Sequence, residues 1–228
     1  MKVAIVSKPG NDQEKTIADL RAAGLEHVEQ NPEVVLSYGG DGTFLIAERL
    51  HPGIPKLLIR DSKICNKCEK HTIEDALQAI RLNRFKTEEH PKIKAIVGEK
   101  EVQGVNDIVL RNTLPTHALR FELKVGDETF EEELIGDGIV VATPFGAGAY
   151  YYSIAKRAFN TGLGLAFNNL TKDLNHLNFE DTKPVEVKIT RGEAILVADN
   201  NHKTIDIKEG DKILIRKSED TAKIIRLH

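Results

Sequence analysis

The stretch VVLSYGGDGTFLIAERL, residues 34–50, places three glycines around one aspartate between two apolar segments. Residues 34–38 are apolar and β-branched, which is typical of a strand buried on both faces of a parallel sheet. Apolar residues recur at helical intervals from Phe44 to Leu50, and Thr43 is placed to cap the first turn. The glycines therefore mark the point where a strand ends and a helix begins. In an open α/β sheet this edge binds ligands, and its backbone N–H groups favour an anion.

Outward from this stretch, the first third of the chain alternates strands with helices. We expect strands over residues 3–7, 34–38 and 57–60, and helices over residues 12–24, 43–50 and 72–83. This alternation is typical of an α/β domain with a parallel, Rossmann-like sheet.

The rest of the chain is rich in short apolar runs separated by turn residues, which indicates a β-rich second domain. The expected strands cover residues 94–97, 105–111, 118–125, 129–135, 138–143, 185–190, 195–198, 204–207 and 212–215, and one helix covers residues 148–160. We predict an α/β domain over 1–88, a β-rich domain over 89–215, and a C-terminal segment, 216–228, that returns to pair with one of them. Ligand sites favour such junctions, so we expect a cleft between the two domains.

Composition and charge narrow the class of protein. The 228 residues are 40% hydrophobic and 29% charged, as in an ordinary globular protein. A net charge of −3 gives no electrostatic reason to expect nucleic acid or an anionic membrane as a partner. Because no apolar run approaches the roughly 18 residues of a membrane span, and residues 1–7 resemble a strand more than a signal peptide, we expect a cytoplasmic protein.

The only two cysteines, Cys65 and Cys68, form a Cys-Asn-Lys-Cys segment with His71 three residues later. A structural zinc site needs four ligands, and a second ligand pair is missing. We therefore predict two reduced thiols in a polar connection and no metal site. A Cys65, Cys68 and His71 cluster remains a minor alternative.

Two further polar motifs follow the first. Residues 104–110, GVNDIVL, place Asn106 beside Asp107 at the start of an apolar strand. Residues 134–150, LIGDGIVVATPFGAGAY, place Asp137 in a turn before a strand that leads into a segment of small residues. Small residues let a flat ligand approach the backbone closely. Taken singly, each motif is more often a structural turn than a site.

In combination, the three motifs resemble those of the NAD kinases. The quoted residues are Gly-Gly-Asp-Gly-Thr, then Val-Asn-Asp, then Gly-Asp-Gly-Ile-Val-Val-Ala-Thr-Pro-x-Gly-x-x-Ala-Tyr, and the resemblance covers almost the whole chain. The first motif is shared with diacylglycerol, sphingosine and 6-phosphofructo kinases. The third is far more specific to NAD kinases.

The resemblance implies a role for each matching residue. Asp41 corresponds to the catalytic aspartate that approaches the 2′-hydroxyl of the adenosine ribose. Asn106 and Asp107 correspond to the pair that contacts the adenosine and its ribose, and Asp137 to the aspartate at the nicotinamide end. The residues expected to bind NAD are Gly40, Gly42, Thr43, Asn106, Asp107, Asp137, Thr143, Gly146, Gly148, Ala149, Tyr150 and Ser153. The resemblance also implies a homodimer or homotetramer whose neighbouring subunits complete the site.

The chemistry of phosphoryl transfer agrees with this assignment. The reaction needs an acceptor oxygen in line and a triphosphate neutralised by Mg²⁺ and backbone donors. We therefore expect NAD and a phosphoryl donor as substrates, Mg²⁺ as cofactor, and Asp41 to orient the hydroxyl and accept its proton. The sequence has no Gly-x-x-x-x-Gly-Lys-Ser/Thr, so it is not a P-loop kinase, and no Gly-x-Gly-x-x-Gly follows its first strand.

The sequence departs from the family pattern at two places. Ala147 and Gly148 replace a serine and a threonine, which removes two hydroxyls near the adenine, and residues 58–61 replace a Gly-Ile-Asn segment. The residues alone leave open a related kinase acting on a lipid or sugar hydroxyl, and a nucleotide-binding regulator without turnover. They also leave open ATP or polyphosphate as donor, and NAD or NADH as acceptor.

Overall fold

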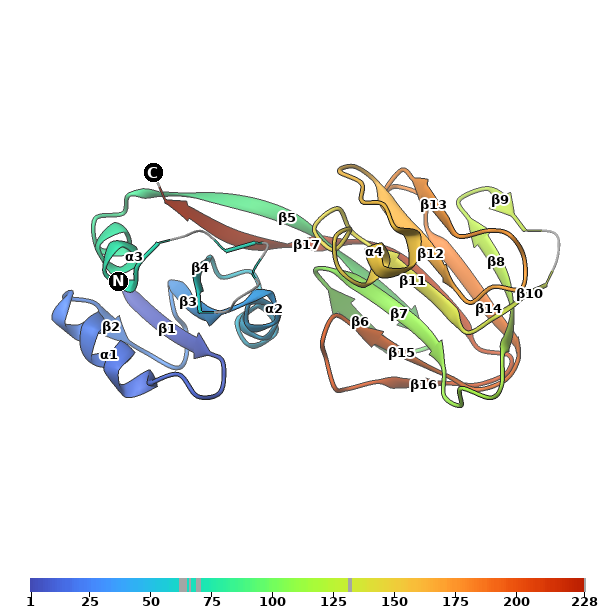
Figure 1. The fold of residues 1–228 in the computed structure, drawn as a ribbon, viewed down its shortest axis with the longest axis horizontal. Helices are drawn as coiled ribbons and strands as arrows, with labels where there is room; N and C mark the ends of the chain where they lie inside the picture. The colour runs from blue at the N-terminus through green and yellow to red at the C-terminus, as the bar shows by residue number, and fades with distance from the viewer. Residues whose placement is uncertain (62–64, 66, 69–70, 131–132, 228) are drawn as a thin grey trace. The chain divides into compact units, whose positions relative to one another are not determined.

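A computed structural model describes residues 1–61, 65, 67–68, 71–130 and 133–227 of the chain. It divides into two compact units (Figure 1). Unit 1 comprises Met1–His90 with Thr221–His228, and unit 2 comprises Pro91–Asp220. An α/β unit with a parallel sheet is followed by a β-rich unit, which confirms the predicted fold class.

Unit 1 is built on a parallel sheet. Its strands are β1 (Lys2–Ser7), β2 (Glu26–His27), β3 (Val34–Gly39) and β4 (Lys56–Arg60), and their order in the sheet is β4-β3-β1-β2. All of these pairs are parallel, and the end of β17 (Lys212–Leu227) adds a further parallel partner to β4. The C-terminal residues therefore extend the sheet of unit 1.

Helices cover both faces of this sheet. Val3, Ile5 and Leu36 face a cluster with Leu20 of α1 (Gln13–Ala22) and with Ala76, Leu77 and Ile80 of α3 (Ile73–Arg81). The alternate residues Ala4, Val6 and Val35 pack with Ala47 of α2 (Asp41–Leu50) on the other face. Burial on both faces explains why β1 and β3 read as almost continuous apolar runs.

The helix starts have local causes. Asp12 caps α1 by accepting a hydrogen bond from the Lys15 N–H at 2.9 Å. Thr72 and Asp75 form a capping box at α3, in which each side chain accepts from the other residue's N–H. These caps fix where two of the predicted helices begin.

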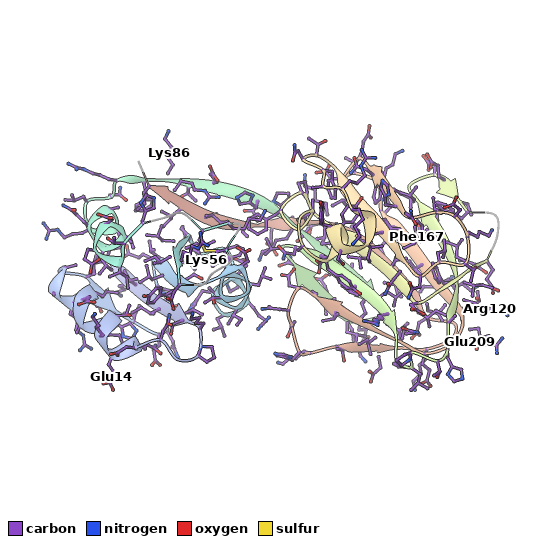
Figure 2. All side chains as sticks on the ribbon, viewed as in Figure 1. Glu14, Lys56, Lys86, Arg120, Phe167 and Glu209 are labelled. Atoms are coloured by element: carbon purple, nitrogen blue, oxygen red, sulfur yellow. A yellow bond between two sulfur atoms is a disulfide. The ribbon has the colours of Figure 1, made fainter. Side chains whose placement is uncertain are left out.

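One ion pair is buried in unit 1, between Lys56 and Glu48 (Figure 2, where Lys56 is labelled). Lys56 also donates to the His51 carbonyl, and Glu48 accepts from the Gly53 N–H at 3.0 Å. Glu48 is near the end of α2 and Lys56 begins β4, so the pair joins these two elements. Removing one partner would leave an uncompensated buried charge, which is strongly destabilising.

Unit 2 contains two antiparallel arrangements of strands. One has the order β13-β12-β11-β7-β15-β16, and the other includes β10-β8-β14-β17 together with the β5–β6 hairpin and the short β9. The strands are β5 (Phe85–Val97), β6 (Lys100–Gly104), β7 (Asp107–Asn112), β8 (Leu119–Val125), β9 (Glu128–Thr129), β10 (Leu134–Gly136), β11 (Gly138–Ala142), β12 (Leu163–Asn168), β13 (His176–Phe179), β14 (Val185–Arg191), β15 (Ala194–Ala198) and β16 (Ile205–Ile207). A single core cluster takes residues from both arrangements, including Leu110, Phe121, Leu165 and Ile213.

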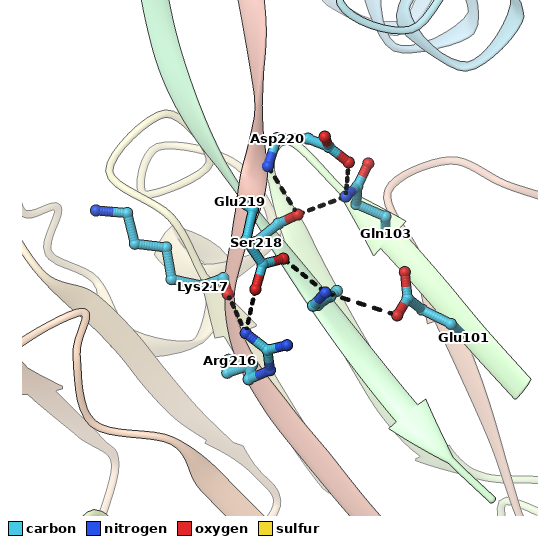
Figure 3. A network of polar contacts seen from close by, with 8 residues as sticks. Glu101, Gln103, Arg216, Lys217, Ser218, Glu219 and Asp220 are labelled. Carbon is cyan, nitrogen blue, oxygen red and sulfur yellow. Dashed lines mark hydrogen bonds and ion pairs between the residues drawn. The ribbon is translucent and has the colours of Figure 1, made fainter. Parts of the chain in front are cut away.

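A polar network holds β5, β6 and β17 together in unit 2 (Figure 3). Lys94 donates to Glu219 at 2.6 Å, and Gln103 donates to Ser218 at 2.6 Å and to Asp220 at 2.9 Å. Hydrogen bonds from Lys94 and Arg216 lower the pKa of Glu219 to about 2. The charged segment in the middle of β17 thus finds partners on neighbouring strands.

The structure differs from the predicted elements at several points. β17 is one strand of 16 residues where a strand over 212–215 and a separate C-terminal segment over 216–228 were expected, because the network above accommodates its polar centre. The helix expected over 148–160 is limited to α4 (Tyr150–Ala155), because Lys156 adopts a left-handed conformation. Strands β2, β6, β12 and β13 were not predicted. Among the described residues, no helix has the length and apolarity needed to cross a membrane.

Candidate functional site

Asp41 is the first residue of α2, immediately after the loop that ends β3. Gly40 occupies the N-cap position in an extended conformation, and Asp41, Gly42 and Thr43 form the first turn. A carboxylate at this position is favoured by the positive end of the helix dipole. The sequence therefore predicted correctly that the aspartate lies between a buried strand and a helix.

Thr43 takes part in capping the first turn, as predicted, but it does so from the N3 position of α2. The helix begins two residues earlier, and the Thr43 Oγ1 accepts a hydrogen bond from the Gly40 N–H at 3.3 Å. Thr43 is buried, and a Cβ on Gly39 would collide with its hydroxyl. Gly39 and Thr43 thus fix the shape of the backbone before Asp41.

The surroundings of Asp41 include the cysteine segment. The Lys67 N–H donates to the Asp41 Oδ1 at 3.1 Å, and the Cys65 Sγ lies 3.0 Å from the same oxygen. Arg226 donates to the Lys67 carbonyl at 3.0 Å, which ties the segment to the end of β17. Burial lowers the pKa of Lys67, while the carboxylate of Asp41 acts in the opposite direction.

Cys65 and Cys68 are joined by a disulfide, so the prediction of two reduced thiols was wrong for this structure. The Cys-x-x-Cys spacing is compatible with a disulfide as well as with two thiols, and the two Cα atoms, 5.5 Å apart, lie in the usual range for a disulfide. The alternative cluster of Cys65, Cys68 and His71 was also wrong. Within the part of the chain that the structure describes, the metal-ligating group around the cysteines contains Asp41 in place of His71.

The carboxyl ends of the unit 1 strands line a polar depression of about 420 Å³. Lys8 pairs with Asp61 at 2.9 Å, and Asn11 donates to the Tyr38 carbonyl at 3.3 Å. The residues that line the depression are Gly10, Asn11, Asp12, Lys15, Thr16, Asp19, Tyr38, Asp61, Ile73 and Glu74. This is the strand edge where the sequence predicted ligand binding.

In unit 2, Asn106 lies in the turn between β6 and β7, and Asp107 is the first residue of β7. The Asp199 side chain holds the N–H groups of this turn. Its carboxylate accepts hydrogen bonds from the N–H groups of Val105, Asn106 and Asp107 at 2.8, 2.7 and 3.2 Å, and the Asp199 N–H donates to the Asp107 carbonyl at 3.0 Å. The backbone of the turn is therefore fixed by a residue that follows β15.

The Asp107 carboxyl is buried, with only 5% of the residue exposed. Burial, together with the nearby charge of Asp199, raises the pKa of Asp107 to about 7. Burial also raises the pKa of Asp199, while its three N–H donors and the Lys92 ammonium act in the opposite direction. Asp107 can therefore carry a proton near neutral pH and donate it in a hydrogen bond to a ligand.

Thr143 and Gly146 pack directly behind this turn. The buried Thr143 hydroxyl donates to the Val105 carbonyl at 2.6 Å and accepts from the Gly146 N–H at 3.2 Å. A Cβ on Gly146 would collide with the backbone of Asn106. Thr143 and Gly146 thus shape the position of Asn106, a structural role that the sequence motif alone did not indicate.

The segment that follows is more open. Gly148 and Ala149 are exposed, and Ala149 is the N-cap of α4. Tyr150 begins the helix and packs against a small apolar cluster of β11 and β12 residues, while Ser153 is exposed and donates to the Tyr150 carbonyl at 2.7 Å. A Cβ on Gly148 would meet nothing within 4 Å.

Asp137 does not join the other predicted residues of unit 2. Its carboxylate accepts from the Asn112 amide at 3.2 Å and from the Asn169 amide at 2.7 Å. Gly138 pairs with Arg111 and Ala142 with Asp107, so Asp137 and Asp107 lie at opposite ends of the β7–β11 pair. The five residue steps from Asp137 to Ala142 span about 17 Å at roughly 3.4 Å per residue, which separates Asp137 from the Asn106 turn within one chain.

Sequence reasoning missed Asp199 and Lys92. Asp199 sits in a short Ala-Asp-Asn turn after an apolar strand, a pattern common to many turns. Lys92 is buried in β5, and its ammonium donates to Gln103 at 3.4 Å. The only signal was a charged residue at the edge of an apolar strand, and nothing in the sequence pointed from either residue to the Asn106 turn.

The chain has an α/β unit with a glycine-flanked aspartate, and a β-rich unit with a fixed Asn-Asp turn follows it. Together these features define the class of protein, a small-molecule kinase of two domains. The profile of the ATP-NAD kinase C-terminal domain matches residues 105–227, more than half of the chain. The chain belongs to the ATP-NAD kinase family.

Individual relatives support this. The chain is 27% identical to an NAD kinase of Methanothermobacter thermautotrophicus, with 92% of this chain and 77% of the relative covered. It is also 27% identical to an NAD kinase of Saccharolobus solfataricus, with 99% and 94% covered.

Two solved structures share the fold. An Archaeoglobus fulgidus NAD kinase in complex with ATP superposes with a TM-score of 0.84 at 22% identity, covering all of this chain and 94% of the other. A yeast NADH kinase complexed with NADH gives a TM-score of 0.86 at 14% identity, covering all of this chain and 84% of the other.

Proposed function

We propose that the protein is an NAD kinase, which transfers the γ-phosphoryl group of ATP to the 2′-hydroxyl of the adenosine ribose of NAD and so forms NADP. Membership of the ATP-NAD kinase family supports this function. The observation that carries the proposal is the position of Asp41, on the first turn of α2 directly after the buried strand β3.

Asp41 orients the acceptor hydroxyl and takes its proton. A carboxylate is a weak base for an alcohol, so the proton leaves late, as the oxygen bonds to phosphorus and the bond to the leaving diphosphate breaks. Positioning therefore contributes more than basicity. The backbone from Gly39 to Thr43 is held by the packing of Gly39 against Thr43 and by the hydrogen bond from Gly40 to Thr43. It therefore supplies a rigid base for that positioning.

Mg²⁺ neutralises the charge of the donor when bound, and it is held chiefly by phosphate oxygens and water. The three-ligand group found among the described residues, Asp41 with Cys65 and Cys68, contains two sulfur atoms and does not suit this hard ion. We therefore assign no protein cage to Mg²⁺ and expect it to enter with the nucleoside triphosphate.

Unit 2 provides the dinucleotide contacts. Asn106 and Asp107 present an amide and a carboxyl from a turn fixed by Asp199, and these groups suit the hydroxyls of a ribose. Gly148 and Ala149 are exposed and have little side-chain bulk, so the dinucleotide can lie against the segment from Gly146 to Tyr150 at these two residues. Ser153 adds an exposed hydroxyl on the first turns of α4.

We further propose a homodimer or homotetramer in which Asp137 serves a neighbouring subunit. Within one chain Asp137 is at the far end of β7–β11 from Asp107, and both of its carboxylate oxygens are held by amides. A fixed carboxylate away from the site of its own chain fits the expectation that neighbouring subunits complete the site. A cytoplasmic location is likewise a proposal, drawn from the sequence.

One assay tests the proposed function. The full chain is incubated with Mg²⁺, either ATP or polyphosphate, and either NAD or NADH, and the 2′-phosphorylated product is measured with a dehydrogenase specific for NADP(H). We expect product with at least one donor and acceptor. A panel of lipid and sugar alcohols serves as the comparison, and phosphorylation of one of these, with none of NAD or NADH, would overturn the proposal.

A further inference from the structure

Three potential metal ligands meet at the start of α2. The Cys65 Sγ is 3.0 Å from the Asp41 Oδ1, and the ligand atoms of Asp41, Cys65 and Cys68 all lie within 4.8 Å of one another. The Lys67 N–H donates to the same Asp41 oxygen at 3.1 Å, which holds that oxygen toward the cysteine segment. Asp41 and Cys68 are partly exposed and Cys65 is 9% exposed, so an ion can reach the group from the side of Asp41 and Cys68.

The state of the sulfur atoms decides what this group can bind. As a disulfide, Cys65 and Cys68 have no thiolate to offer a metal. A dithiol reductant transfers two electrons and two protons to the S–S bond, which gives two thiols and leaves the reductant as a disulfide. The two thiols then lie in a Cys-x-x-Cys spacing, the commonest arrangement for a pair of zinc ligands.

We propose that the reduced Cys65–Cys68 pair and Asp41 form a Zn²⁺ site. Two thiolates and one carboxylate oxygen supply three ligands, water supplies the fourth, and the two thiol protons are released on binding. Soft thiolates favour Zn²⁺ over Mg²⁺, which requires oxygen ligands, so the ion of the donor substrate does not compete for the site.

A consequence follows for the reaction, and it depends on the proposed function. A zinc ion on the Asp41 Oδ1 withdraws the carboxylate that orients the acceptor hydroxyl. The site is therefore inhibitory, and it exists only after reduction. In the disulfide form Asp41 is protected from zinc.

The binding test uses the full chain, reduced with a dithiol, freed of the reductant without air, and titrated with Co²⁺ as a spectroscopic probe. We expect one Co²⁺ per chain, with sulfur-to-cobalt charge-transfer absorption and the visible bands of a tetrahedral ion, both displaced by Zn²⁺. The air-oxidised protein and the Cys65→Ser/Cys68→Ser variant should show neither signal.

Asp41→Asn tests whether Asp41 is a third zinc ligand or whether the two cysteines bind the ion without it. It should weaken Zn²⁺ binding to the reduced protein by about tenfold or more, since even an outer-shell partner is worth that much. Asp19→Asn, which removes a carboxylate of α1 outside the group, is the matched control and should leave the affinity unchanged. Equal affinity in the Asp41→Asn variant, or equal affinity in the double Ser variant, would overturn the proposal.

The activity test is separate. Stoichiometric Zn²⁺ should lower the phosphorylation rate of the reduced wild type by about tenfold or more, while the double Ser variant keeps its rate at the same zinc concentration. Equal inhibition of both proteins would refute the inhibitory role. A protein that binds Co²⁺ as expected but phosphorylates no acceptor would refute the proposed function and leave the metal site standing.

Discussion

At the scale of single residues, Asp41→Asn tests the proposed catalytic role of Asp41. The substitution keeps the shape of the side chain and removes the charge that we propose orients the hydroxyl and takes its proton. We expect the turnover number to fall by about 100-fold or more, with NAD affinity much less affected, because the loss is confined to the transition state. Steady-state kinetics and equilibrium binding measure the two effects separately. A variant as active as the wild type would contradict the assignment.

Gly148 tests whether the missing threonine affects base recognition. A Cβ added at Gly148 meets no neighbour within 4 Å, and the backbone is outside the left-handed region, so the fold should tolerate Gly148→Thr. We expect NAD to bind more tightly than its hypoxanthine analogue by roughly 1 kcal/mol over the wild-type difference, the size of one net hydrogen bond.

The control is Gly146→Ala, where the new Cβ would collide with the Asn106 backbone. This variant should lose stability while Gly148→Thr keeps it. Unchanged relative affinity in a folded Gly148→Thr protein would show that position 148 does not read the base.

The buried carboxyl of Asp107 predicts a pH dependence of stability. Its pKa is about 7 in the folded chain against 3.8 for an exposed aspartate, so the unfolded state ionises first as the pH rises. The contribution of Asp107 is therefore fully present below pH 3.8 and is lost as the pH rises toward 7. Asp107→Asn removes this loss. The free energy of unfolding of the variant, minus that of the wild type, should therefore rise by on the order of 2 kcal/mol from pH 5 to pH 8.

Urea unfolding of the two proteins at both pH values measures this difference. Subtracting the wild-type curve cancels the titration of histidines that both proteins share. A difference between the variant and the wild type that does not change with pH would place the Asp107 pKa near its ordinary value.

At the scale of elements, the end of β15 supports the start of β7. Asp199→Ala leaves three N–H groups without their acceptor, and we expect the free energy of unfolding to fall by about 3 kcal/mol or more. Asp199→Asn keeps one acceptor oxygen and should lose less. Urea unfolding distinguishes the two variants, and equal losses would show that the carboxylate fork is not what holds the turn.

Elements also show what the sequence could predict. The strand, glycine loop and helix at residues 34–50 follow from apolar periodicity and local turn chemistry, and the structure reproduces them with a shift of two residues at the helix start. The union of the predicted strand 212–215 with the C-terminal segment into β17 depends on partners such as Lys94 and Gln103, more than 100 residues away. Local pattern cannot reveal such contacts.

The candidate site divides in the same way. Asp41, Asn106 and Asp107 could be predicted as site residues because their motifs are short and ordered along the chain. Asp199 acts on backbone N–H groups 92 to 94 residues away, so its role depends on the tertiary fold. The contact of Cys65 with Asp41 arises from the return of a loop to the edge of the sheet, which strand and helix periodicity do not encode.

At the scale of the whole molecule, β17 belongs to two cores. Ile213 is buried in the cluster of unit 2, and Ile225 is buried in the cluster of unit 1, 12 residues further along the same strand. Each side chain is therefore a probe of one unit, with the same residue type, the same strand and near-complete burial in both cases.

We expect Ile225→Ala and Ile213→Ala each to cost about 2–5 kcal/mol, the usual range for a buried isoleucine. If the units unfold as separate cooperative blocks, amide hydrogen exchange will speed up in β1, β3 and β4 for Ile225→Ala, and in β7, β8 and β14 for Ile213→Ala. Mass spectrometry of peptides from each unit measures both responses in one experiment. Faster exchange throughout the chain in both variants would instead mean that β5 and β17, which run from one unit into the other, couple the two cores into a single cooperative block.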